Sequence, residues 1–128
     1  MPRIHHLGVT VADLTAAAAQ FDPVLTALGY TRHDDETCIT WWAGEAPGIL
    51  LYAAREQGTG PHVHGRVGWQ HLGFEVASRD EVERLHRIAT DAGWTAVREP
   101  AEYPRFTATY YASFVEDANG IRIEFLHA

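Results

Sequence analysis

The stretch HLGVTVAD at residues 6–13 returns in the second half of the chain as HLGFEVAS at residues 71–78. A second pair, LGYT at 28–31 and AGWT at 92–95, recurs at almost the same spacing. In a chain of 128 residues, two repeated stretches indicate one structural module that is built twice. Each copy begins with a histidine on its expected first strand, and these histidines are the first candidates for chemistry.

The composition is that of an ordinary soluble globular protein, with 46% hydrophobic and 21% charged residues. A chain of this length forms one domain and buries roughly two-thirds of its unfolded surface. The net charge is −7 with no basic cluster, which argues against binding to nucleic acid or to anionic membranes. No apolar run approaches the ~20 residues that a membrane span needs.

Cysteine usage and the start of the chain both predict a cytoplasmic protein. Cys38 is alone, so no disulfide framework is expected, and a reducing compartment suits the free thiol. The first residues, MPRIHH, contain no apolar signal core.

The hydrophobic pattern predicts strand, helix and three strands in each module. Module one covers about 1–54, a glycine-rich linker about 55–68, and module two about 69–128. Helices are expected near 13–28 and 79–92, and Pro23 predicts a kink or break in the first. Besides the strand that begins at His71, strands are expected at about 4–11, 30–34, 38–43, 48–54, 94–99, 109–116 and 121–127. The fold class is therefore α+β, with two tandem βαβββ modules whose curved mixed sheets enclose a concave site.

Three side chains should share the sheet face that points away from the helices. Apolar residues alternate with His6 and with His71 along the two first strands, and a helix covers each apolar row. On the last strand Glu124 alternates with apolar residues in the same way. A carboxylate on an inward face is costly unless it is paired or coordinated. Two imidazoles and one carboxylate are the ligand set of mononuclear non-haem iron sites.

Other interpretations of these residues remain open. Each histidine could be a satisfied polar residue in a cleft, with Glu124 paired to Arg122. His62 and His64 in the linker form an H-x-H pair that could bind metal, but a stable site needs about three protein ligands. Two loop histidines without further ligands are more often exposed.

The repeated strand stretch and the ending VEDANGIRIEF at residues 115–125 resemble the vicinal oxygen chelate superfamily. That group includes glyoxalase I, extradiol dioxygenases, fosfomycin resistance proteins and bleomycin resistance proteins. The resemblance covers nearly the whole chain. It implies paired βαβββ modules around one divalent metal ion (Fe, Mn, Ni or Zn), with His6, His71 and Glu124 as ligands and Glu124 as the catalytic carboxylate. It also implies a homodimer.

The sequence departs from the glyoxalase I pattern at one ligand position. The resemblance to glyoxalase I implies four metal ligands, one of which is a glutamate on the last strand of module one. Here the corresponding stretch is GILLY at residues 48–52, and Leu50 is the best match to the missing ligand. Lactoylglutathione lyase activity is therefore not expected, and the three-ligand set resembles that of extradiol dioxygenases or fosfomycin transferases.

The position of several residues makes them candidates for a pocket that binds a small molecule. Aromatic lining suits an apolar or aromatic ligand, although core packing is the commoner role of strand aromatics. Arginines could bind a substrate anion or form exposed salt bridges. The candidate pocket residues are Trp41, Leu50, Tyr52, Arg105, Tyr110 and Arg122.

Two functions from different classes fit these observations. The first is a metal-dependent lyase, isomerase, transferase or dioxygenase that acts on a small oxygen-bearing molecule. The second is a protein that binds and sequesters an antibiotic-like molecule without metal, as bleomycin resistance proteins do. Those relatives lack the metal ligands, whereas this chain keeps three, which favours the enzyme.

Overall fold

Strand β1 (His6–Val11) shows the alternation that the sequence predicts, with Val9 and Val11 buried and His6 and Thr10 exposed. The structure, a computed structural model, describes residues 1–128. Helix α1 (Leu14–Ala27) follows directly because the Asp13 carboxylate caps it, accepting the backbone N–H of Ala16 at 2.9 Å.

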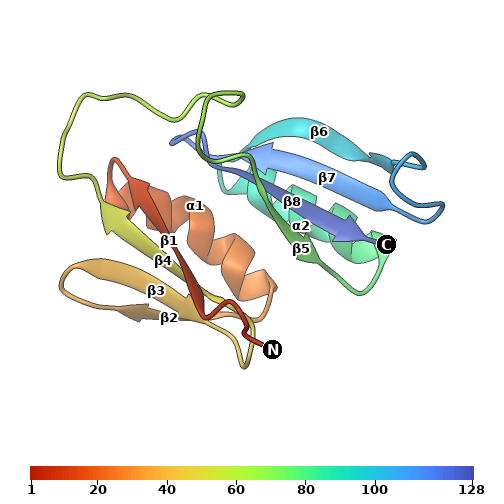
Figure 1. Cartoon of the computed structure of the whole chain (residues 1–128), viewed down its shortest axis with the longest axis horizontal. Helices are drawn as coiled ribbons and strands as arrows, with labels where there is room; N and C mark the ends of the chain where they lie inside the picture. The colour runs from red at the N-terminus through yellow and green to blue at the C-terminus, as the bar shows by residue number, and fades with distance from the viewer. The chain divides into compact units, whose positions relative to one another are not determined.

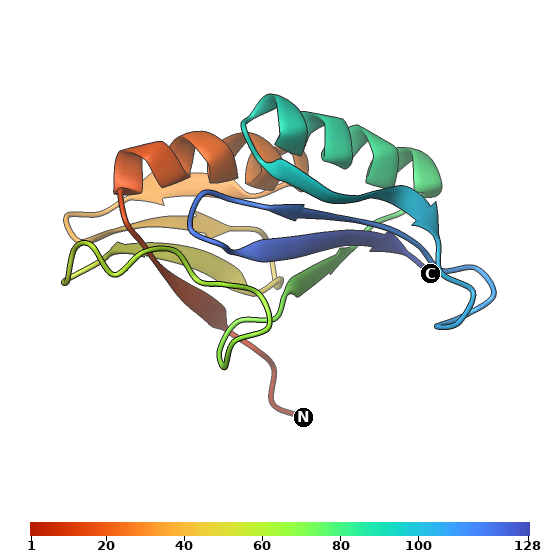
Figure 2. The same ribbon diagram turned by 90° about the horizontal axis from the view of Figure 1, so that it is seen from above.

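The first sheet is mixed and has the strand order β1-β4-β3-β2. Its other strands are β2 (Thr31–Asp34), β3 (Cys38–Trp42) and β4 (Gly48–Ala53). Strand β1 pairs in parallel with β4, and the remaining pairs are antiparallel. Figure 1 shows these strands in order, and Figure 2 shows α1 lying against one face of their sheet.

The second sheet repeats this plan with the order β5-β8-β7-β6. Its elements are β5 (Leu72–Glu75), α2 (Arg79–Asp91), β6 (Thr95–Glu102), β7 (Tyr111–Glu116) and β8 (Arg122–His127). Strand β5 pairs in parallel with β8, as β1 does with β4. The predicted α+β class with two tandem βαβββ modules is confirmed.

Helix α2 covers one face of the second sheet, as Figure 2 shows. The Ser78 hydroxyl caps it by accepting the backbone N–H of Glu81 at 3.2 Å. Its apolar stripe, Val82, Leu85 and Ala89, is fully buried. The opposite face of this sheet is free of the helix and carries the polar side chains described below.

The structure differs from two local predictions, both at prolines: the first helix has no break at Pro23, while a kink there stays a prediction, and the strand before Pro100 is longer than expected. Helix α1 continues through Pro23 from Leu14 to Ala27 without a break. Strand β6 was expected to end before Pro100 but extends to Glu102. Its pairing with β7 shifts register between Ala96 and Arg98 and again between Arg98 and Ala101. These irregularities allow Pro100, which has no backbone N–H to donate to the neighbouring strand, to lie within β6.

The chain divides into two compact units, Met1–Gly60 and Pro61–Ala128, with the boundary inside the glycine-rich connection. Each unit contains one sheet and one helix, and each is described by itself. None of the helices combines the length and the apolar character that crossing a membrane requires.

Candidate functional site

The Glu124 carboxylate is the most deeply buried acidic group of the second unit, with only 3% of the residue exposed. It lies on β8 directly beside Gly73 of β5, on the face opposite the helix. The Tyr110 hydroxyl donates to Glu124 Oε2 at 2.6 Å, and His71 Nε2 lies 3.3 Å from Oε1. Arg122 instead pairs with Glu116, so the alternative pairing of Arg122 with Glu124 is wrong.

The two ring nitrogens of His71 face different side chains, Gln70 at Nδ1 and Glu124 at Nε2. The Nδ1 atom lies 2.5 Å from the side-chain oxygen of Gln70, an acceptor, and this contact favours the tautomer that carries its proton on Nδ1. In the neutral ring, Nε2 then presents a lone pair to the Glu124 oxygen 3.3 Å away. Two acceptors in this arrangement need a proton or a cation between them.

Burial raises the pKa of the Tyr110 phenol well above its ordinary value of 10.0, and the hydrogen bond to Glu124 raises it further. The phenol therefore stays protonated at neutral pH and remains a hydrogen-bond donor. It fixes Oε2 of the carboxylate and leaves Oε1 turned toward His71.

His6 opens β1 in the first unit, on the exposed face of its sheet. Its Nδ1 atom lies 2.8 Å from Nδ1 of His5, and the Trp42 ring lies 6.5 Å away between centroids. No group of three or more histidine, cysteine, aspartate or glutamate side chains in this structure is arranged to hold a metal ion. His71 and Glu124 are thus brought together, while the participation of His6, which belongs to the other unit, stays a prediction.

Trp41 was predicted to line the pocket, but the structure places it in the core. Its side chain is fully buried against α1, and its indole N–H donates to Asp22 at 2.9 Å. The adjacent Trp42 takes the opposite face and lies beside His5 and His6. Gly48 makes room for it, because a Cβ atom there would overlap the Trp42 ring.

The sheet registers of the two units identify Leu50 as the counterpart of Glu124. Leu50 lies beside Gly8, as Glu124 lies beside Gly73 in the repeated stretch. The first unit therefore carries a buried aliphatic side chain where the second carries a carboxylate. Tyr52, two residues further along β4, is 40% exposed, and a Cβ atom at Gly8 would lie 3.6 Å from its ring.

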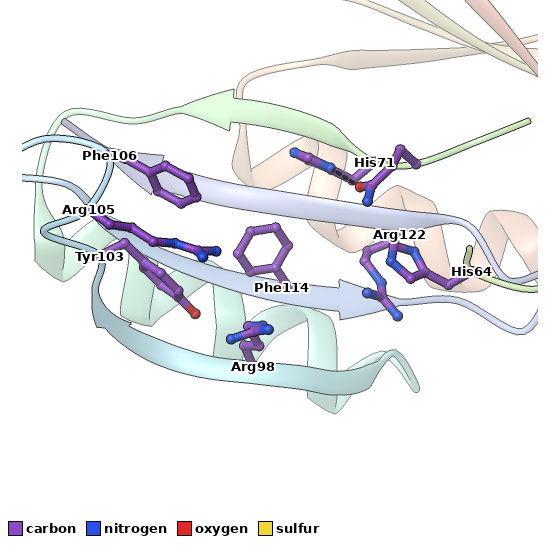
Figure 3. A pocket seen from close by; sticks show the side chains of 9 residues that line it. His64, His71, Arg98, Tyr103, Arg105, Phe106, Phe114 and Arg122 are labelled. Atoms are coloured by element: carbon purple, nitrogen blue, oxygen red, sulfur yellow. Dashed lines mark hydrogen bonds between the residues drawn. The ribbon is translucent and has the colours of Figure 1, made fainter. Parts of the chain in front are cut away.

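A cavity of about 220 Å³ opens on the helix-free face of the second sheet, as Figure 3 shows. Its polar lining is His64, Gln70, His71, Arg98, Arg105 and Arg122. Its aromatic lining is Tyr103, Phe106 and Phe114. The sequence had indicated Arg105 and Arg122 as pocket residues, and both line this cavity.

The loop after β6 supplies an aromatic wall. Tyr103 stacks on Phe106 at 6.0 Å and meets Phe114 of β7 edge to face at 6.2 Å. Phe106 also contacts Tyr110, the donor to Glu124, at 5.1 Å between centroids. This wall connects the cavity to the buried carboxylate.

Arg98 and Phe114 belong to the cavity but were missed by the sequence reasoning. Both lie in one row across the sheet, because Arg98 pairs with Phe114 and Phe114 with Glu124. The alternation on β7 could have placed Phe114 on this face. No sequence signal could have placed Arg98, because the irregular pairing of β6 changes which of its residues face the cavity.

The two linker histidines have different surroundings. His62 is structural, since its backbone N–H donates to Asn119 and its Nε2 atom lies 2.8 Å from the Trp69 carbonyl. His64 lines the cavity, and its buried Nδ1 atom has no hydrogen-bond partner. Ligation of metal by this pair alone is not supported by their geometry.

The chain is thus an α+β protein built from two repeated βαβββ units, each with a mixed sheet that a helix covers on one face. The chain belongs to the Glyoxalase/Bleomycin resistance protein/Dioxygenase superfamily, which it matches over residues 3–125.

The chain is also similar to individual proteins. The chain is 26% identical over 122 residues to the uncharacterized protein YqjT of Bacillus subtilis, covering 94% of this chain and 95% of the relative. A glyoxalase/bleomycin resistance protein from Albidiferax ferrireducens has the same fold, with a TM-score of 0.79, 20% identity and 98% coverage of both chains. A lactoylglutathione lyase from Agrobacterium tumefaciens gives a TM-score of 0.67 at 20% identity, covering 98% of this chain and 93% of that one.

Proposed function

We propose that this protein is a divalent-metal-dependent enzyme that acts on a small oxygen-bearing molecule, with His6, His71 and Glu124 as metal ligands. The observation that carries the proposal is the approach of His71 Nε2 to the buried Glu124 Oε1, at 3.3 Å. Membership of a superfamily that includes lyases and dioxygenases supports it.

The chemistry of these three side chains supports a divalent metal ion as the bound group. Two imidazoles and a carboxylate form a ligand set typical of iron and related divalent ions. Glu124 is buried and forms no ion pair with an arginine; its partners are the Tyr110 hydroxyl and His71 Nε2. A divalent cation would add charge compensation to this buried carboxylate. The surrounding hydrogen bonds also suit a ligand site, since Gln70 fixes the His71 tautomer and Tyr110 fixes the carboxylate.

A bound divalent ion supplies Lewis-acid chemistry by polarising a substrate oxygen. The protein's own groups have distinct tasks beside it. Tyr110 holds Oε2 of Glu124, which leaves Oε1 directed toward His71 as the oxygen that would hold the cation. The aromatic wall around Phe106 and Phe114 gives one side of the cavity an apolar surface.

The reaction is proposed to be of the lyase, isomerase, transferase or dioxygenase type, and lactoylglutathione lyase activity is disfavoured. In the four-ligand plan of glyoxalase I, the position that Leu50 holds would need a carboxylate. Leu50 offers neither a ligand atom nor a proton acceptor. The likeness to the Agrobacterium lyase at 20% identity concerns the fold alone.

Metal binding tests the proposal directly. The purified protein is stripped with chelator and titrated with Fe²⁺, Mn²⁺, Ni²⁺ and Zn²⁺ by calorimetry, with elemental analysis of the untreated sample. We expect one ion per chain, and we expect His6→Ala, His71→Ala and Glu124→Gln each to lower the affinity at least about tenfold. His33→Ala, on the exposed edge strand β2, is the matched control and should bind as the parent does.

The alternative function, metal-independent sequestration of a small molecule, makes the opposite prediction. A protein that stays metal-free in excess of all four ions, yet binds small molecules tightly in chelator, would establish sequestration in place of metal catalysis. Equal metal affinity of His71→Ala and His33→Ala would likewise remove His71 from the site.

We further propose that the chain is a homodimer and acts in a reducing compartment such as the cytoplasm. Superfamily resemblance supports the dimer, and the buried free thiol of Cys38 suits a reducing compartment. Light scattering at micromolar concentration measures the first, and a monomer mass would contradict it. Localisation of a tagged chain measures the second.

A further inference from the structure

We propose that the cavity of the second unit selects a small molecule that joins an anionic oxyacid group to a flat apolar body, such as an aromatic carboxylate. This proposal rests on the proposed function, because it names the substrate class of the same site. Its evidence is separate: the charge and the aromatic lining of the cavity, neither of which a metal ion requires.

The charge of the cavity is opposite to that of the chain. The protein has a net charge of −7, yet none of the side chains that line the cavity carries a carboxyl group. Three of the ten arginines of the chain line it instead, from β6, the loop after β6, and β8. Figure 3 shows the guanidinium groups of Arg98, Arg105 and Arg122 arranged around the Phe114 ring.

These arginines differ in how much charge they leave for a ligand. Arg122 donates to one Glu116 oxygen from both Nε and Nη2, at 3.0 and 2.9 Å, so its charge is largely compensated. Arg98 and Arg105 form no ion pair, and Arg105 lies over the Phe106 ring at 4.8 Å. Two uncompensated guanidiniums beside a cavity favour a carboxylate or phosphonate, which they bind through paired N–H donors.

The rest of the lining favours a flat apolar body on the ligand. Phe106 is 52% exposed, although it stacks on Tyr103, so a large apolar surface faces open space. Phe114 lies between this wall and His71, whose ring meets it edge to face at 5.5 Å. The volume of about 220 Å³ is below that of drug-sized pockets, so a single ring or a short chain fits.

The experiment uses benzoate, phenylphosphonate and the neutral isostere benzamide, titrated into the full chain in chelator and followed by NMR chemical shifts. We expect at least one anion to bind at least about fivefold more tightly than benzamide, with shifts in Phe106 and Phe114. The difference should shrink at high salt because exposed charges are screened. Preference for benzoate or for phenylphosphonate distinguishes a planar carboxylate from a tetrahedral group.

Variants assign the effect to the cavity. Arg98→Gln and Arg105→Gln should each lower anion affinity about fivefold and leave benzamide binding unchanged. Both arginines are exposed, so either variant should fold, and Arg87→Gln on the exposed face of α2 is the matched control. Equal binding of benzoate and benzamide, insensitivity to both variants, or no anion binding up to about 10 mM would overturn the proposal. Metal affinity, measured separately, reports on the proposed function and should not change in these variants.

Discussion

Replacing Tyr110 by Phe removes the only hydroxyl that donates to the buried Glu124 carboxylate. The lost bond is 2.6 Å long and its acceptor residue is 3% exposed. A hydrogen bond to a charged group contributes about 1.5–3 kcal/mol, and the half-buried position of Tyr110 favours the lower end. We therefore expect the free energy of unfolding to fall by about 1.5–2 kcal/mol. For a chain of this length that lowers the Tm by about 6–7 °C.

Urea denaturation in chelator measures this loss, with Tyr52→Phe as the control because no hydrogen bond involves the Tyr52 hydroxyl. Adding Glu124→Gln to Tyr110→Phe gives a double-mutant cycle, in which the coupling between the two side chains should be at least about 1 kcal/mol. A loss below about 0.5 kcal/mol, or additive single losses, would refute a stabilising contact between phenol and carboxylate.

The same contact predicts a dependence on alkaline pH. Because the folded-state pKa of Tyr110 is raised above 10.0, mainly by burial, the unfolded chain releases this proton first. The phenol's contribution to stability is therefore full below about pH 10 and is lost as the pH rises through the raised pKa. The stability difference between the parent protein and Tyr110→Phe should shrink over this range, and a constant difference would contradict the linkage.

Two glycine substitutions give further predictions, each with a matched control. In Gly73→Ala the new Cβ would lie 3.2 Å from the neighbouring carboxylate oxygen, so metal affinity should fall about tenfold, whereas Gly8→Ala meets its neighbour at an ordinary 3.6 Å and should change little. Calorimetric titration with metal compares the two. Gly120→Ala would overlap the His62 carbonyl at a φ of 76°, and should cost more than about 2 kcal/mol in urea denaturation. Gly58→Ala, at a φ of 77° in open space, carries only the backbone strain and should cost less.

The elements of the fold could be predicted because local patterns determine them. The alternation along β1, the Asp13 and Ser78 caps and the glycines after both helices are visible in the sequence and act within a few residues. Pro23 misled the prediction because tertiary packing of α1 outweighs the loss of one helical hydrogen bond. Neighbouring Phe21 and Val24 are buried in the core of the unit.

The candidate site was only partly predictable because it depends on which side chains share a face. Glu124 and His71 follow from strict alternation, and the structure brings them together. The choice between Trp41 and Trp42 needed the hydrogen bond from Trp41 to Asp22, which joins residues distant in sequence. Placing Arg98 in the cavity required the register of β6 against β7, which shifts on either side of this residue. Long-range pairing, and not composition, decides each of these positions.

The two units provide an internal comparison for the cost of the site. Both place a glycine of the first strand beside a buried residue of the last strand, but that residue is Leu50 in one unit and Glu124 in the other. Stability alone favours the leucine, since a buried carboxylate costs several kcal/mol unless it is paired and hydrogen-bonded. The unit with the carboxylate is also the one whose cavity holds unpaired arginines and a row of aromatic rings. The charged groups of the second unit are therefore better explained by a ligand than by folding.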